Sequence, residues 1–295
     1  GRAHLSTPAM HGLLRAGVPL TLVTRRGRIR GQLLSSDAGR LRRRMGQHQM
    51  FIHEPSRLCA AQRIVARKFQ AMHRMIERCV SNHSGLPAAS ARRELQRMER
   101  RIPTITDLGA LRGIEGTATR AYWRFFRAAN RSELHFPKRA ARPPQDPVNA
   151  LLSLGYTLLA QELSNALYGH GLDAELGFFH APRPGRPALA LDLLEPLRHD
   201  ITDRLVLKSI NRRQFKAVDF LHHSQRGTRL TSEALKRFLD LYEQTMLATP
   251  ASELLDPERP ATSTRIALWR RCEALAESFG RIGKKQLQPA CPNSY

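Results

Sequence analysis

Three side chains able to bind a metal ion lie close together in one stretch of the sequence. His180 comes shortly before a turn, and Asp192 and Glu195 follow it in a segment with helical character. Residues three apart share one face of a helix, so the two carboxylates can point the same way. An imidazole and two carboxylates suit Mg²⁺ or Mn²⁺. The alternative is a solvated acidic face beside an uninvolved histidine, although leucines surround both acids.

Glu115 is a second candidate because it lies on the apolar face of a predicted helix. Leu111 and Tyr122 fall on the same face, where a carboxylate is costly unless a cation or hydrogen bonds compensate it. Gly113 and Gly116 flank it, and each weakens a helix by roughly 1 kcal/mol relative to Ala. Such glycines indicate close approach of backbone or ligand. A structural salt bridge between Glu115 and one of the many arginines is the alternative.

Other motifs give weaker signals. His222 and His223 are adjacent, so they point in different directions on any regular element and do not suit joint ligation. Ser164 and Ser209 lack the sharp strand-to-helix turn of a hydrolase nucleophile. The sequence contains neither a P-loop nor the glycine pattern of a dinucleotide-binding fold, which argues against both classes.

The cysteines do not indicate a metal site or a disulfide framework. None of Cys59, Cys79, Cys272 and Cys291 forms a CxxC pair, so zinc binding has weak support. Cys59 and Cys79 fall among the apolar positions of a helical stretch, and we expect them to be small core residues. This usage fits a reducing, cytoplasmic setting.

The charge of the chain indicates a polyanionic partner. The formal net charge is +23 over 295 residues, and a surface this positive attracts nucleic acid first and acidic membrane second. No basic amphipathic helix with an aromatic face stands out, which favours nucleic acid. The sequence shows neither a membrane span nor a signal peptide. Plain surface charge is the alternative interpretation.

The first 54 residues are expected to contain a short helix and two strands. Residues 5–15 read as a helix, with Ser6 or Thr7 as its cap. Residues 18–23 and 29–34 read as strands joined by Arg25-Arg26-Gly27. A basic connector without regular structure is expected around residues 40–49.

The remainder is expected to be helical. Apolar residues recur at helical spacing from residue 56 onward, and Asp146 and Pro147 are suited to begin a long helix. A basic loop is expected at 130–145, an extended piece at 176–180 and a turn at 183–187. Helices are expected at about 56–80, 90–99, 104–129, 146–169, 188–207, 232–247 and 263–279, with Pro196 near the start of the fifth or at a kink in it.

Several segments resemble a known family in their order and spacing. They are Gly113-Ile114-Glu115-Gly116, residues 149–156 (NALLSLGY), Gly177-Phe178-Phe179-His180, residues 183–187 (RPGRP) and residues 189–198 (LALDLLEPLR). Together they resemble the CRISPR-associated endonuclease/integrase of spacer acquisition, the Cas "one" protein family. The resemblance covers roughly residues 3–280.

The resemblance implies an α+β fold, with a truncated N-terminal β-sandwich domain followed by a mainly α-helical catalytic domain. On this basis residues 1–54 are the remainder of the β domain and a linker, and residues 55–282 form the metal-dependent catalytic domain. Residues 283–295 are expected to be a disordered tail. The sequence lacks an initial Met and supplies only two strands before residue 56. We therefore expect it to be an N-terminally incomplete fragment, with further strands upstream.

The resemblance also implies the site and the partners. Glu115, His180 and Glu195 match the family's metal ligands, for Mg²⁺ or Mn²⁺, and Asp192 matches a further catalytic acid. The family acts as homodimers around a small Cas "two" partner. It joins the 3′-OH ends of a short DNA duplex, the spacer, to the CRISPR repeat by transesterification.

Two other functions stay open on the residues alone. One is a structure-selective DNA repair nuclease that uses the same site without integrating spacers. The other is a basic, helical nucleic-acid-binding protein without catalysis. Direct transesterification needs no ATP, because the energy of the broken phosphodiester passes into the new one, and the missing P-loop agrees with this chemistry.

Overall fold

The computed structural model describes residues 4–23, 29–35, 38–140, 143–225, 227–250 and 260–285. The chain divides into two compact units. Unit 1 comprises residues 1–60, 160–193 and 250–295, and unit 2 comprises residues 61–159 and 194–249. No helix in the described ranges combines the length and the apolar character needed to cross a membrane. The predicted domain boundaries after residues 54 and 282 stay predictions.

Unit 1 begins with the predicted helix and strand pair. Helix α1 (Thr7–Arg15) is capped by the Ser6 hydroxyl, which accepts a hydrogen bond from the Ala9 amide at 3.3 Å. Strands β1 (Leu20–Val23) and β2 (Ile29–Leu33) pair antiparallel. These expectations are confirmed, whereas the predicted connecting turn lies outside the described residues.

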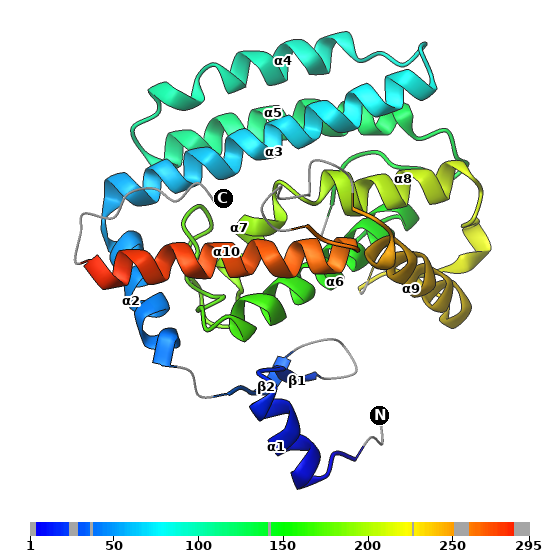
Figure 1. The fold of residues 1–295 in the computed structure, drawn as a ribbon. Helices are drawn as coiled ribbons and strands as arrows, with labels where there is room; N and C mark the ends of the chain where they lie inside the picture. The colour runs from blue at the N-terminus through cyan, green and yellow to red at the C-terminus, as the bar shows by residue number, and fades with distance from the viewer. Residues whose placement is uncertain are drawn as a thin grey trace. The chain divides into compact units, whose positions relative to one another are not determined.

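The connector expected to lack regular structure is instead a helix, so that prediction was wrong. Helix α2 (Ala38–Ile52) packs along α10 (Thr264–Lys285), and both belong to unit 1 (Figure 1). The two helices approach so closely that a Cβ atom on Gly46 would lie 2.0 Å from the Phe279 carbonyl oxygen. The arginines of α2 obscure its apolar pattern, and packing against α10 stabilises the helix. Helix α10 also continues to Lys285, past the start of the tail expected from residue 283.

Unit 2 is built mainly from helices. The part of α3 (Glu54–Asn82) after residue 60 lies beside α5 (Leu108–Ala129), and α4 (Ala89–Glu99) packs against α5 (Figure 1). Of the apolar residues that recur at helical spacing along α3, Leu58 is half-buried and the later ones are buried: Ala61, Val65, Phe69, Met72 and Ile76. Unit 2 also contains the first part of α6 (Pro147–Gly169), a π-helix (His199–Asp203), α8 (Arg204–Asn211) and α9 (Ser232–Leu247).

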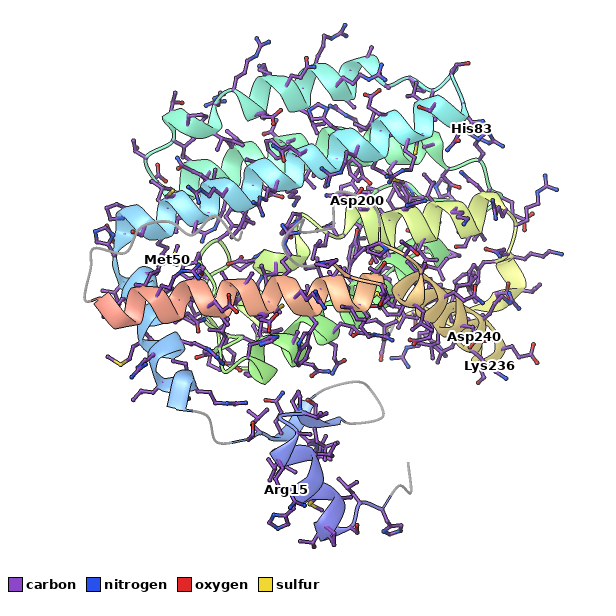
Figure 2. The ribbon with its side chains drawn as sticks, viewed as in Figure 1. Arg15, Met50, His83, Asp200, Lys236 and Asp240 are labelled. Carbon is purple, nitrogen blue, oxygen red and sulfur yellow. The ribbon has the colours of Figure 1, made fainter. Side chains whose placement is uncertain are left out.

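Aspartates cap helices α6 and α5. The Asp146 carboxylate accepts a hydrogen bond from the Asn149 amide at 2.8 Å, which confirms the predicted start of α6. Asp107 accepts one from the Ala110 amide at 2.8 Å, so α5 begins slightly later than the threonines that were expected to start it. Helix α9 has the predicted bounds, and charged side chains such as Lys236 and Asp240 cover its exposed face (Figure 2).

The segment expected to form one helix at 188–207 is divided. Helix α7 (Ala188–Leu194) ends before Pro196, which cannot donate a backbone hydrogen bond inside a helix. The chain then forms the π-helix and α8. π-helical turns are rare and are often found at functional sites. The turn before α7 is confirmed, with Gly185 at φ +70°.

Cysteines and small sheets differ in part from expectation. Cys59 and Cys79 are half-buried rather than core residues, whereas Cys272 is buried, and all three are free.

Strands β3 (Phe220–His223) and β4 (Gly227–Leu230) form an antiparallel hairpin that the sequence did not indicate. The expected extended piece at 176–180 is not a strand. The described ranges are thus mainly helical with two small antiparallel sheets, and they do not confirm a β-sandwich.

Gly155, in the part of α6 that belongs to unit 2, has no room for a side chain. A Cβ atom there would lie 2.5 Å from Thr202 Cγ2 in the π-helix and 3.4 Å from Phe238 Cζ. We expect Gly155→Ala to lower the free energy of unfolding by about 1–3 kcal/mol, because overpacking outweighs the better helix propensity.

Gly113 is the matched control, since a Cβ atom there meets nothing within 4 Å. Gly113→Ala is expected to raise the free energy of unfolding by up to about 1 kcal/mol. Urea denaturation of both variants measures the difference. Equal effects would mean that the contact between α6 and the π-helix is not tight.

Candidate active site

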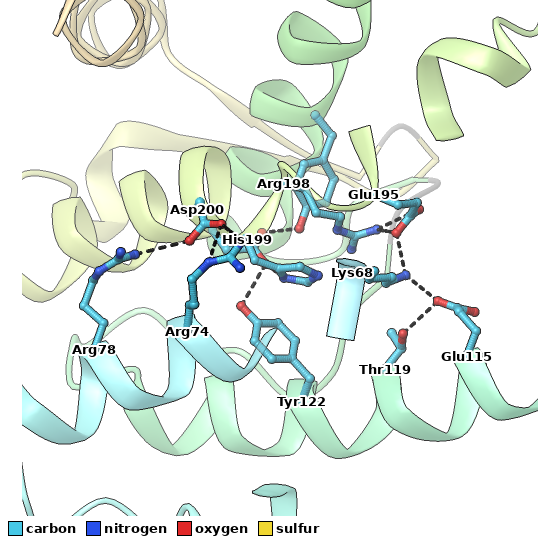
Figure 3. A network of polar contacts seen from close by, with 12 residues as sticks. Lys68, Arg74, Arg78, Glu115, Thr119, Tyr122, Glu195, Arg198, His199 and Asp200 are labelled. Atoms are coloured by element: carbon cyan, nitrogen blue, oxygen red, sulfur yellow. Dashed lines mark hydrogen bonds and ion pairs between the residues drawn. The ribbon is translucent and has the colours of Figure 1, made fainter. Parts of the chain in front are cut away.

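Two of the predicted site carboxylates meet at one buried ammonium group (Figure 3). Lys68 Nζ forms an ion pair with Glu115 Oε1 and another, at 2.5 Å, with Glu195 Oε2. The exposed fraction of the Lys68 side chain is 3%, against 18% for Glu115 and 9% for Glu195. The structure therefore brings Glu115 and Glu195 together, on α5 and directly after α7.

Lys68 was missed in the sequence, although a signal was present. It stands on the apolar side of α3, three residues after Val65 and four before Met72, both of which are buried. A lysine in such a position needs an anionic partner. Glu115 therefore does form an ion pair, but with a lysine and not with the arginine that the alternative expected.

The glycines beside Glu115 do not face packed backbone. A Cβ atom on Gly113 would meet nothing within 4 Å, and one on Gly116 would meet only Arg120 Nη1, at 3.7 Å. Close approach of backbone, the first explanation for these glycines, was wrong for the described residues. Thr119, one turn after Glu115, donates its hydroxyl to Glu115 Oε1 at 2.8 Å.

Arg198 binds Glu195 from a second direction. Its Nη1 lies 3.3 Å from Glu195 Oε1 and 3.4 Å from Oε2. The guanidinium group stacks 4.4 Å from the centroid of the Tyr156 ring, a favourable cation–π arrangement. Burial acts to lower the pKa of Arg198, but Tyr156, Glu195 and Asp203 outweigh it and raise the pKa. Arg198 therefore stays charged and holds Glu195 in place.

Asp203 is a buried anion in the same network as Arg198 and Tyr156. The Tyr122 hydroxyl donates to Asp203 Oδ2 at 2.9 Å, the Tyr156 hydroxyl donates to Oδ1, and His199 Nδ1 lies 2.7 Å from Oδ2. Burial acts to raise the pKa of Asp203, but His199, Arg198 and Tyr156 outweigh it and lower the pKa. Asp203 is therefore ionised, fully buried and surrounded by donors.

His199 is the neutral member of this network. Burial lowers its pKa more than Asp203 raises it, while Arg198 and Lys68 lower it further. The neutral ring donates Nδ1–H to Asp203, which leaves Nε2 as an acceptor that has no hydrogen-bond partner within the described part of the chain.

A third set of ion pairs attaches the π-helix to α3. Asp200 is buried, and its Oδ2 lies 2.6 Å from Arg74 Nη2. Arg78 Nη1 lies 3.4 Å from the other carboxylate oxygen. Because Lys68, Arg74 and Arg78 all stand on α3, this helix contacts the segment that follows α7 along three of its turns (Figure 3).

In unit 1, Asp192 organises the loop that carries His180. Its carboxylate accepts hydrogen bonds from the backbone amides of Phe178, Phe179 and His180 at 2.6, 3.0 and 2.9 Å. His180 Nδ1 lies 2.8 Å from Asp192 Oδ1. Asp192 is fully buried, so in this structure it orients His180 through its carboxylate.

The predicted residues thus form two groups. Glu115 and Glu195 belong to unit 2, whereas His180 and Asp192 belong to unit 1. Within neither unit do the described residues include three or more His, Cys, Asp or Glu side chains grouped to hold a metal ion. The predicted three-ligand set stays a prediction.

Comparison with known proteins identifies the family. The family model described as CRISPR associated protein Cas1 matches residues 1–244. CRISPR-associated endonuclease Cas1 1 of Chlorobaculum tepidum is 36% identical over 235 residues, covering 77% of this chain and 68% of that protein. CRISPR-associated endonuclease Cas1 2 of Rhodospirillum rubrum is 34% identical over 255 residues, covering 83% and 73%. The chain belongs to the Cas1 family, as the resemblance predicted.

Solved structures share the fold. A casposase bound to integration product aligns with a TM-score of 0.78 and 21% identity, covering 99% of this chain and 79% of that one. At this identity the likeness concerns the fold alone. A chain of a Cas6-RT-Cas1–Cas2 complex aligns with a TM-score of 0.74 and 27% identity, covering 96% of this chain and 30% of that one.

The depressed pKa of His199 predicts a pH dependence of stability. The unfolded chain binds a proton at His199 near pH 6.5, but the folded protein does so only at lower pH. Stability from this residue is therefore complete above pH 6.5 and is lost as the pH falls toward the folded pKa. Between pH 7.5 and 5.5 this loss should amount to roughly 1 kcal/mol.

The comparison is with His199→Asn, whose side-chain amide can replace the Nδ1–H donor to Asp203. Urea denaturation at the two pH values should give a smaller loss of stability in the variant, because the other histidines contribute equally to both proteins. Identical losses in the two proteins would contradict a neutral, buried His199.

Proposed function

We propose that this chain is a metal-dependent DNA endonuclease/integrase that inserts short DNA duplexes, the spacers, into a CRISPR array by 3′-OH transesterification. The observation that carries the proposal is the pair of carboxylates, Glu115 and Glu195, which converge on one cation in a member of the Cas1 family. The names of the two relatives, CRISPR-associated endonucleases, support nuclease chemistry.

The residues suit a divalent ion. Oxygens of Glu115 and Glu195 already face a common positive charge. His180 Nδ1 pairs with Asp192, and metal-binding histidines commonly donate one ring N–H to a carboxylate while the other nitrogen binds. We propose that Glu115, His180 and Glu195 hold Mg²⁺ or Mn²⁺, with Asp192 orienting His180. A bound ion of this kind makes a 3′-hydroxyl more acidic and neutralises charge on the phosphodiester.

The other residues of the network would hold this site in place. Arg198 binds Glu195 and Thr119 binds Glu115, so each carboxylate keeps its orientation when substrate approaches. With water in place of the 3′-hydroxyl, the same site would hydrolyse DNA. The net charge of +23 supports double-stranded DNA as the substrate, bound mainly through its phosphates.

Partners follow from the family and from the structural comparison. Two solved assemblies that contain Cas1 and Cas2 align with this chain at 27% and 26% identity. We propose a Cas2 protein as partner and a homodimer of this chain as the unit that binds it. We also propose that β1 and β2 belong to a β-sandwich domain, since Leu22 on β1 and Val18 just before it are exposed.

Two alternative functions predict different behaviour toward DNA. A structure-selective DNA repair nuclease would cleave branched DNA without joining ends to a repeat. A non-catalytic DNA-binding protein would keep its affinity when a chelator is added and would have no activity to lose. Strand transfer into a plasmid that carries a CRISPR repeat separates the integrase from the repair nuclease. Loss of all activity in a chelator, with DNA binding kept, would argue against the non-catalytic protein.

Replacing the proposed ligands tests the site. We expect Glu115→Ala, His180→Ala and Glu195→Ala each to reduce integration and cleavage by more than about 100-fold, since even outer-shell changes at metal sites cost about 10–100-fold. Asp192→Ala should slow the reaction by misplacing His180. DNA binding should persist, because affinity resides in the arginines.

Glu233→Ala is the control, since Glu233 is exposed on α9. Integration and cleavage are measured with a labelled duplex and a plasmid target. Wild-type rates in Glu115→Ala would contradict the assignment of this residue.

The salt dependence of DNA binding tests the role of the charge. Affinity for duplex DNA should fall steeply and linearly on a log–log plot against salt, because phosphate neutralisation releases counterions. Fluorescence anisotropy from about 50 to 200 mM salt should show a loss of roughly 10³-fold or more if six or more phosphates are contacted. A flat plot would mean that the positive charge serves another purpose.

A further inference from the structure

We propose that Lys68 is a built-in counter-cation that holds Glu115 and Glu195 ready for metal binding, and that a divalent ion binds these carboxylates by displacing the Lys68 ammonium group. The inference rests on the proposed function, because it assumes that the two carboxylates are metal ligands. It assigns a positioning role to a lysine that does not itself react.

The burial of Lys68 shows why the ammonium group matters to the fold. Its side chain is 3% exposed and stands in the apolar interior of unit 2. A buried charge is tolerated only when it is paired, and removal of one partner leaves the other uncompensated. Glu115 and Glu195 would repel each other without the ammonium group, so Lys68 stabilises their approach.

Each carboxylate also has a donor that does not depend on Lys68. Glu115 Oε1 accepts from the Thr119 hydroxyl at 2.8 Å. Glu195 is bound by Arg198 Nη1 at 3.3 and 3.4 Å. These contacts can keep the two side chains oriented after the ammonium group has left, as the arrangement in Figure 3 illustrates.

The local charge argues that the ammonium group and a divalent ion do not share these oxygens. The Lys68 ammonium group already contacts oxygens of Glu115 and Glu195, so a divalent ion on the same oxygens would place two more positive charges beside a buried ammonium group. Like charges a few ångströms apart repel strongly in a buried site. Displacement of the ammonium group removes this repulsion and gives the metal the same carboxylate oxygens.

A lysine is suited to such a movement. Its charge is concentrated at the end of a flexible four-carbon chain, whereas the guanidinium group of an arginine binds carboxylates through a rigid planar fork. The imidazole of His199 lies on the Lys68 side of the network (Figure 3), and its neutral Nε2 offers a displaced ammonium group an acceptor.

The test measures Mn²⁺ binding and thermal unfolding of the full chain, with no DNA and no assay of activity. Lys68→Met removes the charge and keeps the length of the side chain. We expect this variant to melt below wild type in EDTA, to gain more from added Mn²⁺, and to bind Mn²⁺ about tenfold more tightly in calorimetry. Lys208→Met is the matched control, because Lys208 is exposed on α8 and should leave both quantities unchanged.

Lys68→Arg provides a second measurement should the Met variant fail to fold. It keeps the ion pairs, yet a guanidinium group that leaves the carboxylates less readily should weaken Mn²⁺ binding about tenfold. Unchanged or weaker Mn²⁺ binding in Lys68→Met, or unchanged binding in Lys68→Arg, would overturn the inference. Absence of any Mn²⁺ binding in the wild type would instead reject the metal site of the proposed function, and the inference with it.

Discussion

The ion pairs of Lys68 are the interaction on which the rest of unit 2 depends. A charge nearly excluded from water must be compensated, and here the two compensating carboxylates come from α5 and from the segment that follows α7. The pairing therefore determines which face of α5 turns toward α3 and where the chain must run after α7. Asp200, bound to Arg74 on α3, strengthens the same attachment one turn further along the segment.

Behind this pairing, Asp203 acts as the anion that completes the charge balance. It is fully buried and accepts hydrogen bonds from Tyr122, Tyr156 and His199. Tyr156 in turn lies against Arg198, which binds Glu195. The orientation of a proposed metal ligand thus depends on a chain of contacts that extends into the core. His199 and Asp203 stand four residues apart in the π-helix, so both lie on one side of it.

The sequence predicted α6 from its long apolar run and its Asp146 cap, and α9 from its length and bounds. It did not predict α2, whose arginines hide a helix stabilised by contact with α10. The hairpin of β3 and β4 was also missed, because its strands are short and most of β3 is exposed.

For the candidate site, residue types and spacing were sufficient to select Glu115 and Glu195, and the family resemblance supported them. They were not sufficient to find Lys68. A single lysine among apolar residues reads as a tolerated exception until the distance between helices is known. Asp203 was not selected, because its donors Tyr122 and Tyr156 stand on α5 and α6, far from it in the sequence. Such long-range hydrogen bonds leave no periodic signal in the sequence.

The central claim is that Glu115 and Glu195 bind the catalytic metal. The most direct measurement is a crystal structure of the chain with Mn²⁺, in which anomalous scattering locates the ion independently of any assay. The account predicts one strong peak within coordination distance of oxygens from both carboxylates, with the Lys68 ammonium group moved away from them. An ordered ion bound elsewhere, with Lys68 still paired to both carboxylates, would contradict the assignment of Glu115 and Glu195 as metal ligands.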